Sequence, residues 1–202
     1  VRAQSLTARD GAIYLSGGAG SQLSVGGTLD VSSAEAGAQA GRIDVTGERI
    51  TVDATARLLA DAKGSGDGGT VNAIATDAMA FAGTISARGG TAGGNGGNAE
   101  VSGRRTIVMS GRSDLSAPAG AIGTLLLDPG SVSIIDSAGN ENGPNQFGDA
   151  NLATLLASNN ITISTANATD NGVQSINVAS AANVTWSAAT TLTLNAGQSG
   201  IL

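Results

Sequence analysis

The sequence predicts an all-β chain that folds as a right-handed, single-stranded parallel β-helix with one short helical insertion. Three observations lead to this fold class. A glycine-led motif recurs at nearly equal intervals, and short apolar runs alternate with glycine clusters between its copies. Hydrophobic residues make up 41% of the chain but aromatic residues only 2%. A repeat of this kind, built of strands and turns, is typical of a stacked solenoid with an aliphatic core.

The repeat is defined by five short motifs in which a glycine is followed by alternating apolar residues. The motifs begin at Gly11, Gly41, Gly69, Gly97 and Gly123, and the intervals between them are almost constant. The small variation is what loops of different length would produce. A repeat of helix pairs is disfavoured because the units are rich in glycine and threonine and alternate with a period of two.

Residues 1–122 are therefore expected to form regular coils of about 28 residues, each with three strands and one glycine-rich loop. Residues 1–10 are expected to be a lead-in or part of a coil. Strands are expected in the first coil at 13–15, 23–25 and 29–31, and in the second at 43–45, 50–52 and 58–60. The loops of the third and fourth coils are expected at 89–96 and 117–120.

Alternation along the first strand of each coil predicts which side chains enter the core. The expected inward residues are Ile13, Leu15, Ile43, Val45, Val71, Ala73, Ala99, Val101, Leu125 and Leu127. The expected outward residues are Tyr14, Asp44, Asn72, Glu100 and Leu126. Stacked coils lie about 4.8 Å apart, which would put Asp44 and Glu100 about 10 Å apart with Asn72 between them. This spacing keeps like charges off neighbouring strands, and it also leaves open a carbohydrate or cation site on the face.

Residues 123–202 are expected to continue the β-helix with a loop and a short helix. Strands are expected at 125–127 and 132–135, followed by a polar loop at 137–148. Residues 149–158 read as a helix that Asp149 caps and that Leu152, Leu155 and Leu156 pack as a flap against the solenoid. Strands then resume at 161–163, 176–178, 184–186 and 192–194. At roughly 25 residues a coil, the chain would form about eight coils.

Composition excludes several kinds of chemistry. The chain has no cysteine and no histidine, which removes disulfides, thiol nucleophiles, the Ser-His triad and most zinc sites. Ten basic and ten acidic residues precede Ser113, whereas six acidic residues and no basic ones follow it. This balance argues against nucleic acid or an anionic membrane as a partner. Residues 64–69 hold a single aspartate rather than the tandem repeats that a calcium ladder needs, so no cofactor is expected.

Several segments resemble the repeat region of filamentous haemagglutinin-type exoproteins, the large adhesins of bacterial two-partner secretion. They are GGTV at 68–71, FAGTISARGG at 81–90, GGNGG at 93–97, VSG at 101–103 and LLLDP at 125–129. VTWS at 184–187 and LTLNA at 192–196 are similar to a later segment of these proteins. The resemblance implies a right-handed parallel β-helix, export through an outer-membrane transporter, and a place at the surface of a Gram-negative bacterium or in its medium. The family's N-terminal secretion domain is not matched, so this chain would be a fragment of a longer protein.

The sequence therefore predicts a non-catalytic rod segment of a secreted adhesin that mediates attachment, as in biofilms, or presents binding sites to a surface glycan or protein. One alternative is a self-assembling filament subunit, whose unpaired strand edges would associate end to end. A second is a β-helix protein that binds or cleaves polysaccharide, with carboxylates and arginines as candidates. These candidates scatter over non-adjacent coils: Asp44, Glu48, Asp53, Glu100, Arg104 and Arg105. The residues expected to contact a surface ligand are Asp44, Asn72, Glu100, Arg104 and Arg105.

Overall fold

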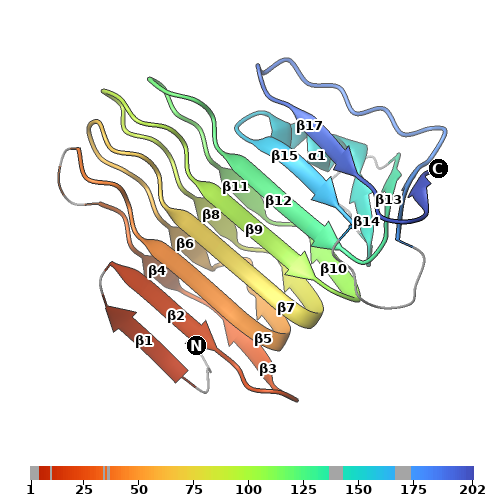
Figure 1. Cartoon of the computed structure of the whole chain (residues 1–202), viewed down its shortest axis with the longest axis horizontal. Coiled ribbons are helices and arrows are strands. Elements are labelled where there is room, and N and C mark those ends of the chain that lie inside the picture. Colours follow the sequence, from red (N-terminus) through yellow and green to blue (C-terminus); the bar gives the residue numbers. More distant parts are fainter. Residues whose placement is uncertain (1–4, 10, 34, 36, 137–142, 167–173) are drawn as a thin grey trace.

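The computed structural model describes residues 5–9, 11–33, 35, 37–136, 143–166 and 174–202. In Figure 1 the chain stacks coil upon coil along one axis, from β1 and β2 at one end to β17 at the other. The fold is a β-solenoid of parallel sheets with about six turns, fewer than the eight expected. The expectation was too high because the later coils are longer: Asn98 pairs with Thr124 in the next coil, but Thr124 in turn pairs with a residue as far along the chain as Asn160.

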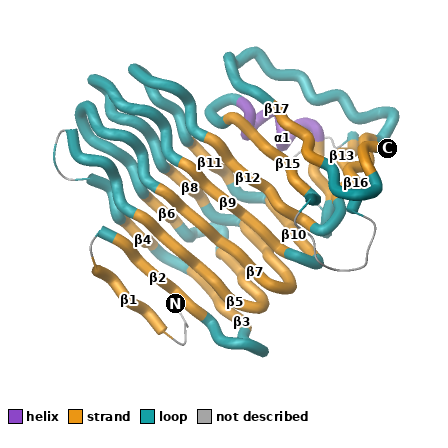
Figure 2. Tube along the Cα trace, viewed as in Figure 1, coloured by secondary structure: helices purple, strands orange, loops and turns teal. Residues whose placement is uncertain are grey.

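The described strands form three sheets, and the tube in Figure 2 shows the strands stacked side by side. The main sheet contains β1 (Ser5–Arg9), β2 (Ala12–Ser16), β3 (Gln22–Val25), β5 (Arg42–Val52), β7 (Thr70–Phe81), β9 (Asn98–Gly103), β10 (Thr106–Met109), β12 (Thr124–Pro129), β15 (Asn160–Ser164) and β17 (Leu192–Asn195). The second sheet contains β4 (Thr28–Asp30), β6 (Arg57–Leu59), β8 (Thr84–Ser86) and β11 (Arg112–Asp114). The third contains β13 (Val132–Ile135), β14 (Gln146–Gly148), β16 (Ser175–Val178) and β18 (Gly200–Ile201). The one described helix is α1 (Asp149–Leu156).

The main sheet keeps one parallel register from β2 to β17. Its first core position runs through Ile13, Ile43, Val71, Ala99, Leu125, Ile161 and Leu192. The glycine-led repeat therefore sets the register, as expected. The strands expected at 43–45 and 50–52 form one strand, β5, which shifts register against β7 between Gly47 and Arg49. A bulge of this kind bends a strand, and the second halves of β5 and β7 carry β3 and β10.

The core follows the predicted alternation. Ile43, Val45, Val71 and Val101 are fully buried, and Ile13, in the first coil, is partly buried against the same cluster. Burying each such aliphatic side chain contributes about 1.5–3 kcal/mol before the cost of ordering the chain is counted. One continuous aliphatic core therefore links the coils along the axis.

The coils of β5, β7, β9 and β12 begin at a glycine because the preceding coil approaches the backbone there. Before β15 the equivalent position is Asn159. A Cβ atom at Gly41, Gly69, Gly97 or Gly123 would lie closer than 3.0 Å to the carbonyl oxygen of the glycine one coil earlier. The same glycine also closes the coil before it: the Gly97 N–H donates to the Ala87 carbonyl at 2.7 Å. At these four coil starts the glycine is thus a steric requirement of stacking, since a side chain would not fit between the coils there.

The N-terminal lead-in is not part of a coil. Strand β1 pairs antiparallel with β2, and Gly11, at φ 70°, precedes β2 in the turn that reverses the chain. The expectation that this segment is part of a coil was wrong. The repeat marked Gly11 as the start of a coil, but its positive φ lets the chain reverse direction between β1 and β2. Strand β1 covers the outer edge of β2, the first parallel strand.

The helix is shorter than expected and ends at Leu156 rather than at 158. Gly148 occupies the N-cap position instead of Asp149. The Asp149 carboxylate accepts hydrogen bonds from the backbone N–H groups of Ala150 and Asn183, at 2.7 and 2.9 Å. Leu152, Leu155 and Leu156 are buried in the core cluster. The helix therefore forms one side of its coil and contributes to the core, whereas the expectation was that it packs on the outside of the solenoid.

The last coils are less regular than the first. Residues 184–186, expected as a strand, have no regular secondary structure. The expected strands at 161–163, 176–178 and 192–194 are present within β15, β16 and β17. Part of the polar loop expected at 137–148 lies outside the described residues. The described residues hold no helix long and apolar enough to cross a membrane.

Candidate binding face of the main sheet

The predicted outward residues form one row across the main sheet. Asp44 on β5 is paired with Asn72 on β7, and Asn72 with Glu100 on β9. This register places Asn72 between the two carboxylates, as expected. Backbone pairing therefore presents the predicted polar side chains on a common face, over three neighbouring coils.

A side-chain hydrogen bond joins two members of the row, Asp44 and Asn72. The Asn72 Nδ2 group donates to Asp44 Oδ1 at 2.8 Å, and the Arg42 Nε group donates to Asp44 Oδ2 at 2.6 Å. The hydrogen bond to Asp44 raises the pKa of Arg42 above its ordinary value. Glu100 instead accepts a hydrogen bond from the Ser102 hydroxyl at 2.7 Å. Asp44 is thus neutralised within the sheet, whereas Glu100 belongs to a different group of side chains.

Arg105 is part of an ion-pair bridge that sequence reasoning missed. Its Nε group donates to Asp77 Oδ1 at 2.7 Å, while the Arg49 Nε group donates to Asp77 Oδ2 at 2.9 Å. The hydrogen bond from Arg105, followed by that from Arg49, outweighs desolvation and lowers the pKa of Asp77. The bridge therefore joins three coils, and the Arg105 guanidinium is already engaged by Asp77.

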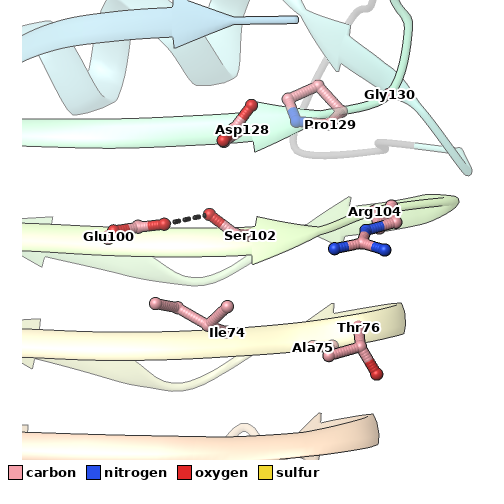
Figure 3. A pocket seen from close by; sticks show the side chains of 9 residues that line it. All are labelled: Ile74, Ala75, Thr76, Glu100, Ser102, Arg104, Asp128, Pro129 and Gly130. Carbon is pink, nitrogen blue, oxygen red and sulfur yellow. Dashed lines mark hydrogen bonds between the residues drawn. The ribbon is translucent and has the colours of Figure 1, made fainter. Parts of the chain in front are cut away.

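Arg104, the preceding residue in the same turn, lies at a shallow pocket of about 180 Å³ on the outer face. Figure 3 shows the pocket between β7, β9 and β12, with the Glu100–Ser102 hydrogen bond beside it. Asp128 is the residue paired with Ser102 across the two strands. Ile74, Pro129 and Gly130 supply the apolar and backbone part of the lining. Within the described part of the chain, the Arg104 guanidinium makes no ion pair.

The lining of this small pocket includes two carboxylates, two hydroxyl groups and a guanidinium. Such a set can accept and donate hydrogen bonds to a polar group, but its volume is below the range of about 300–1,000 Å³ usual for small-molecule sites. Among the described residues, no group of three or more acidic, cysteine or histidine side chains is arranged to hold a metal ion.

The structure therefore places the five predicted contact residues in three separate groups. Glu100 and Arg104 share the pocket, Asp44 and Asn72 share a hydrogen bond, and Arg105 lies in the Asp77 bridge. A signal for the bridge was present in the sequence, because Arg49, Asp77 and Arg105 follow one another at intervals of 28 residues with alternating charge. The pocket residues Ser102 and Asp128 are likewise separated by one coil. Their roles as surface ligand contacts stay predictions.

Comparison of the chain with protein-family models, with curated proteins and with solved structures finds no match.

Proposed function

We propose that this chain is a structural, non-catalytic rod segment of a secreted bacterial surface adhesin of the filamentous haemagglutinin type. The observation that carries the proposal is the unbroken parallel register of the main sheet from β2 to β17. Backbone hydrogen bonds in this arrangement run along the axis, and each coil contacts its neighbours only. A chain built in this way lengthens by one coil at a time without changing its cross-section, which suits a rigid spacer.

The resemblance seen in the sequence supports the same function. Its glycine clusters, GGTV at 68–71 and GGNGG at 93–97, include Gly69, Gly94 and Gly97, where a Cβ atom would lie about 2.0 Å from a carbonyl oxygen of the preceding coil. In this proposal an outer-membrane transporter of two-partner secretion exports the parent protein through its N-terminal domain. The rod then holds its binding surfaces, including the Glu100–Arg104 pocket, away from the cell towards a surface glycan or protein.

Cell-surface labelling tests this proposal. Antibodies raised against this chain would be applied to intact cells of the source bacterium and to cells that lack the outer-membrane secretion partner. We expect labelling of intact wild-type cells and its loss in the mutant. Labelling that requires cell lysis in both strains would contradict surface export.

The polysaccharide-cleaving alternative has less support from the side-chain contacts. Asp44 is bonded to Arg42 and Asn72, and Glu48 accepts the backbone N–H of Gly20 at 2.5 Å. Acid and base groups of such enzymes must face a common substrate bond. Here the contacts tie Asp44 to its own and the next coil and Glu48 to the preceding coil, which favours a structural role for them.

A further inference from the structure

A second surface feature lies far along the chain from the Glu100–Arg104 pocket. It is a groove of about 480 Å³ between the outer side of α1 and the irregular segment 185–188. Its lining includes Trp186, Ala153 and Ala157, together with three hydroxyl side chains, those of Thr154, Thr185 and Ser187. The volume is within the range of about 300–1,000 Å³ that is usual for small-molecule sites.

Trp186 is held in this groove although it is not buried. The indole Nε1–H donates to the Thr190 carbonyl at 3.2 Å, and the Thr190 hydroxyl donates to the Leu156 carbonyl at 2.6 Å. These bonds tie the ring to the end of α1. Its exposed fraction is 38%, whereas Phe81 and Phe147 are each 1% exposed. The core therefore accepts large aromatic rings, and Trp186 is oriented towards solvent by its own hydrogen bonds.

The hydroxyl groups around the ring are also oriented. Thr154 Oγ1 donates to the Ala150 carbonyl at 2.9 Å, and Thr185 Oγ1 donates to Asn183 Oδ1 at 3.2 Å. Each hydroxyl that donates its proton in this way keeps its lone pairs as acceptors. The groove thus combines a flat aromatic surface with fixed hydrogen-bond acceptors on its rim.

Charge narrows the class of ligand. None of the described residues that line the groove is acidic or basic, and the sequence has no lysine or arginine after Arg112. Arg112 and Asp114 line a neighbouring hollow that shares Thr154 with the groove. In the groove itself, a sulfated or carboxylated glycan would meet no cation. A pyranose ring without charge presents an apolar C–H face and a rim of hydroxyl groups, which match the indole and the hydroxyl side chains. Tryptophan is well suited to such a contact because its large apolar ring stays rigid.

We infer that this groove is a binding site for a neutral saccharide. The indole of Trp186 stacks against the C–H face of one sugar ring, and Thr154, Thr185 and Ser187 hydrogen-bond to the sugar hydroxyls. The inference rests on the proposed function, because the rod has to present the groove to a glycan. It adds the class of glycan that the groove would bind. The groove is separate from the pocket at Glu100 and Arg104.

Tryptophan fluorescence tests the inference directly, because Trp186 is the only tryptophan in the chain. The chain would be titrated with cellotetraose and with the N-acetylglucosamine tetramer, both neutral, and with a hyaluronan tetrasaccharide, which is anionic. We expect a saturable shift or quenching with at least one neutral saccharide and a weaker response to hyaluronan. Absence of a saturable response to both neutral saccharides, or an equal response to hyaluronan, would overturn the inference.

Calorimetry with variants then locates the site without relying on the fluorophore. Trp186→Ala should weaken binding by about tenfold or more, while Trp186→Phe keeps most of the affinity because it keeps a stacking ring. Thr154→Val should weaken binding about threefold or more through loss of one hydroxyl. Tyr14→Ala, which removes an aromatic residue 40% exposed at the other end of the solenoid, serves as the control and should bind as the wild type does.

Two further outcomes would also decide the matter. Unchanged affinity of Trp186→Ala would place the saccharide elsewhere and overturn the inference. Fluorescence that shifts with protein concentration alone, together with dimers in sedimentation velocity, would show that a second copy covers the groove and would also overturn it. Neither result affects the surface labelling expected of the rod, so failure of this site is distinguishable from failure of the proposed function.

Discussion

Single residues affect the stability of this fold most at positions that are equivalent in successive coils. Glycine is required at positions 41, 69, 97 and 123 because neighbouring backbones touch there. Charged residues follow the same rule, since Asp61 and Arg88, and Asp77 with Arg49 and Arg105, meet across adjacent coils. A substitution at such a position therefore changes the contacts of at least two coils.

Replacing Gly97 by alanine should destabilise the chain strongly. The new Cβ would lie within 3.0 Å of the Gly69 carbonyl oxygen and the Gly68 carbonyl carbon. Because both are backbone atoms, relief requires separating two coils, and we expect a loss of more than about 3 kcal/mol in urea unfolding. Gly27→Ala is the control, since Gly27 has φ 76° but open space around it. It should lose only about 1 kcal/mol, and equal losses would refute the steric argument.

Asp61 should make stability depend on acid pH. Partial burial opposes its ionisation, but hydrogen bonds from the Arg88 side chain and backbone and from Ser86 outweigh it and lower its pKa below 3.8. A lowered folded-state pKa means that the ionised carboxylate stabilises the fold above the unfolded-state pKa. This contribution is lost as the pH falls below about 3.8 and through the lower folded-state pKa.

Urea unfolding of Asp61→Asn at several pH values measures this effect. We expect the variant to be about 1 kcal/mol less stable than wild type at pH 7, a modest value because the paired arginine is half exposed. The difference should shrink towards zero as the pH falls through the window just described. Glu35→Gln, at an exposed loop position, is the control and should show no such trend. A difference that grows on acidification would contradict the sign.

At the scale of elements, α1 and the strand before it replace the strands of a regular coil. Three asparagine side chains attach this insertion to the coil beneath it. Asn145 accepts from the Ile107 N–H at 2.8 Å, and Asn151 donates to the Met109 carbonyl at 3.0 Å. Asn159, fully buried, donates to the Ser113 carbonyl and accepts from the Leu115 N–H. The asparagines thus supply hydrogen-bond partners along the edges of β10 and β11, and Ser158 adds bonds to Ser113 and Leu115.

Asn159→Ala should therefore loosen the insertion. Loss of the side chain leaves the buried Ser113 carbonyl without one of its donors and removes an acceptor from the Leu115 N–H, and we expect a loss of about 2–4 kcal/mol. Hydrogen exchange should accelerate in residues 112–115 and in α1 more than in β5 and β7. Asn98→Ala, at an exposed position on β9, is the matched control. Uniform acceleration along the whole chain would argue against a local docking role.

At the scale of the whole molecule, the two ends of the solenoid differ. The first parallel strand, β2, is covered by the antiparallel β1, whereas β17 pairs with β15 alone in the described part of the main sheet. Head-to-tail stacking of copies would have to join β17 of one copy to the first parallel strand of the next. An antiparallel cover on that strand opposes such a contact, which disfavours the filament alternative.

Electron microscopy tests this difference between the ends. We expect the purified chain to form discrete rods about 30 Å long, from about six coils at about 4.8 Å each, and a calcium chelator should leave them unchanged. Removal of residues 1–9 should uncover β2 and lengthen the particles into fibres. Fibres of the intact chain would contradict capping by β1, and rods that fall apart with chelator would contradict a metal-free fold.

Much of the fold was predictable because its causes are local and repeated. The regular period, the alternation around Val45 and Val71, and the glycines at the starts of the earlier coils act within one coil and its neighbour. The candidate site was predictable only in part. Alternation placed Asp44, Asn72 and Glu100 on one face, but it could not show that Asp44 is already paired or that Glu100 turns towards Ser102. Side-chain partners depend on rotamers, which a period does not specify.

The pattern of glycines and aliphatic residues in the sequence was enough to predict a parallel β-helix, its register and its inward faces, because stacking and burial act on every coil alike. The folded chain alone revealed the antiparallel direction of β1, the use of α1 as a coil wall, and the exposed orientation of Trp186. Each of these depends on contacts that are made at one place in the fold, such as Asn159 with Ser113 or Trp186 with Thr190. Each of these contacts occurs at one place only, so the repeat pattern of the sequence cannot predict it.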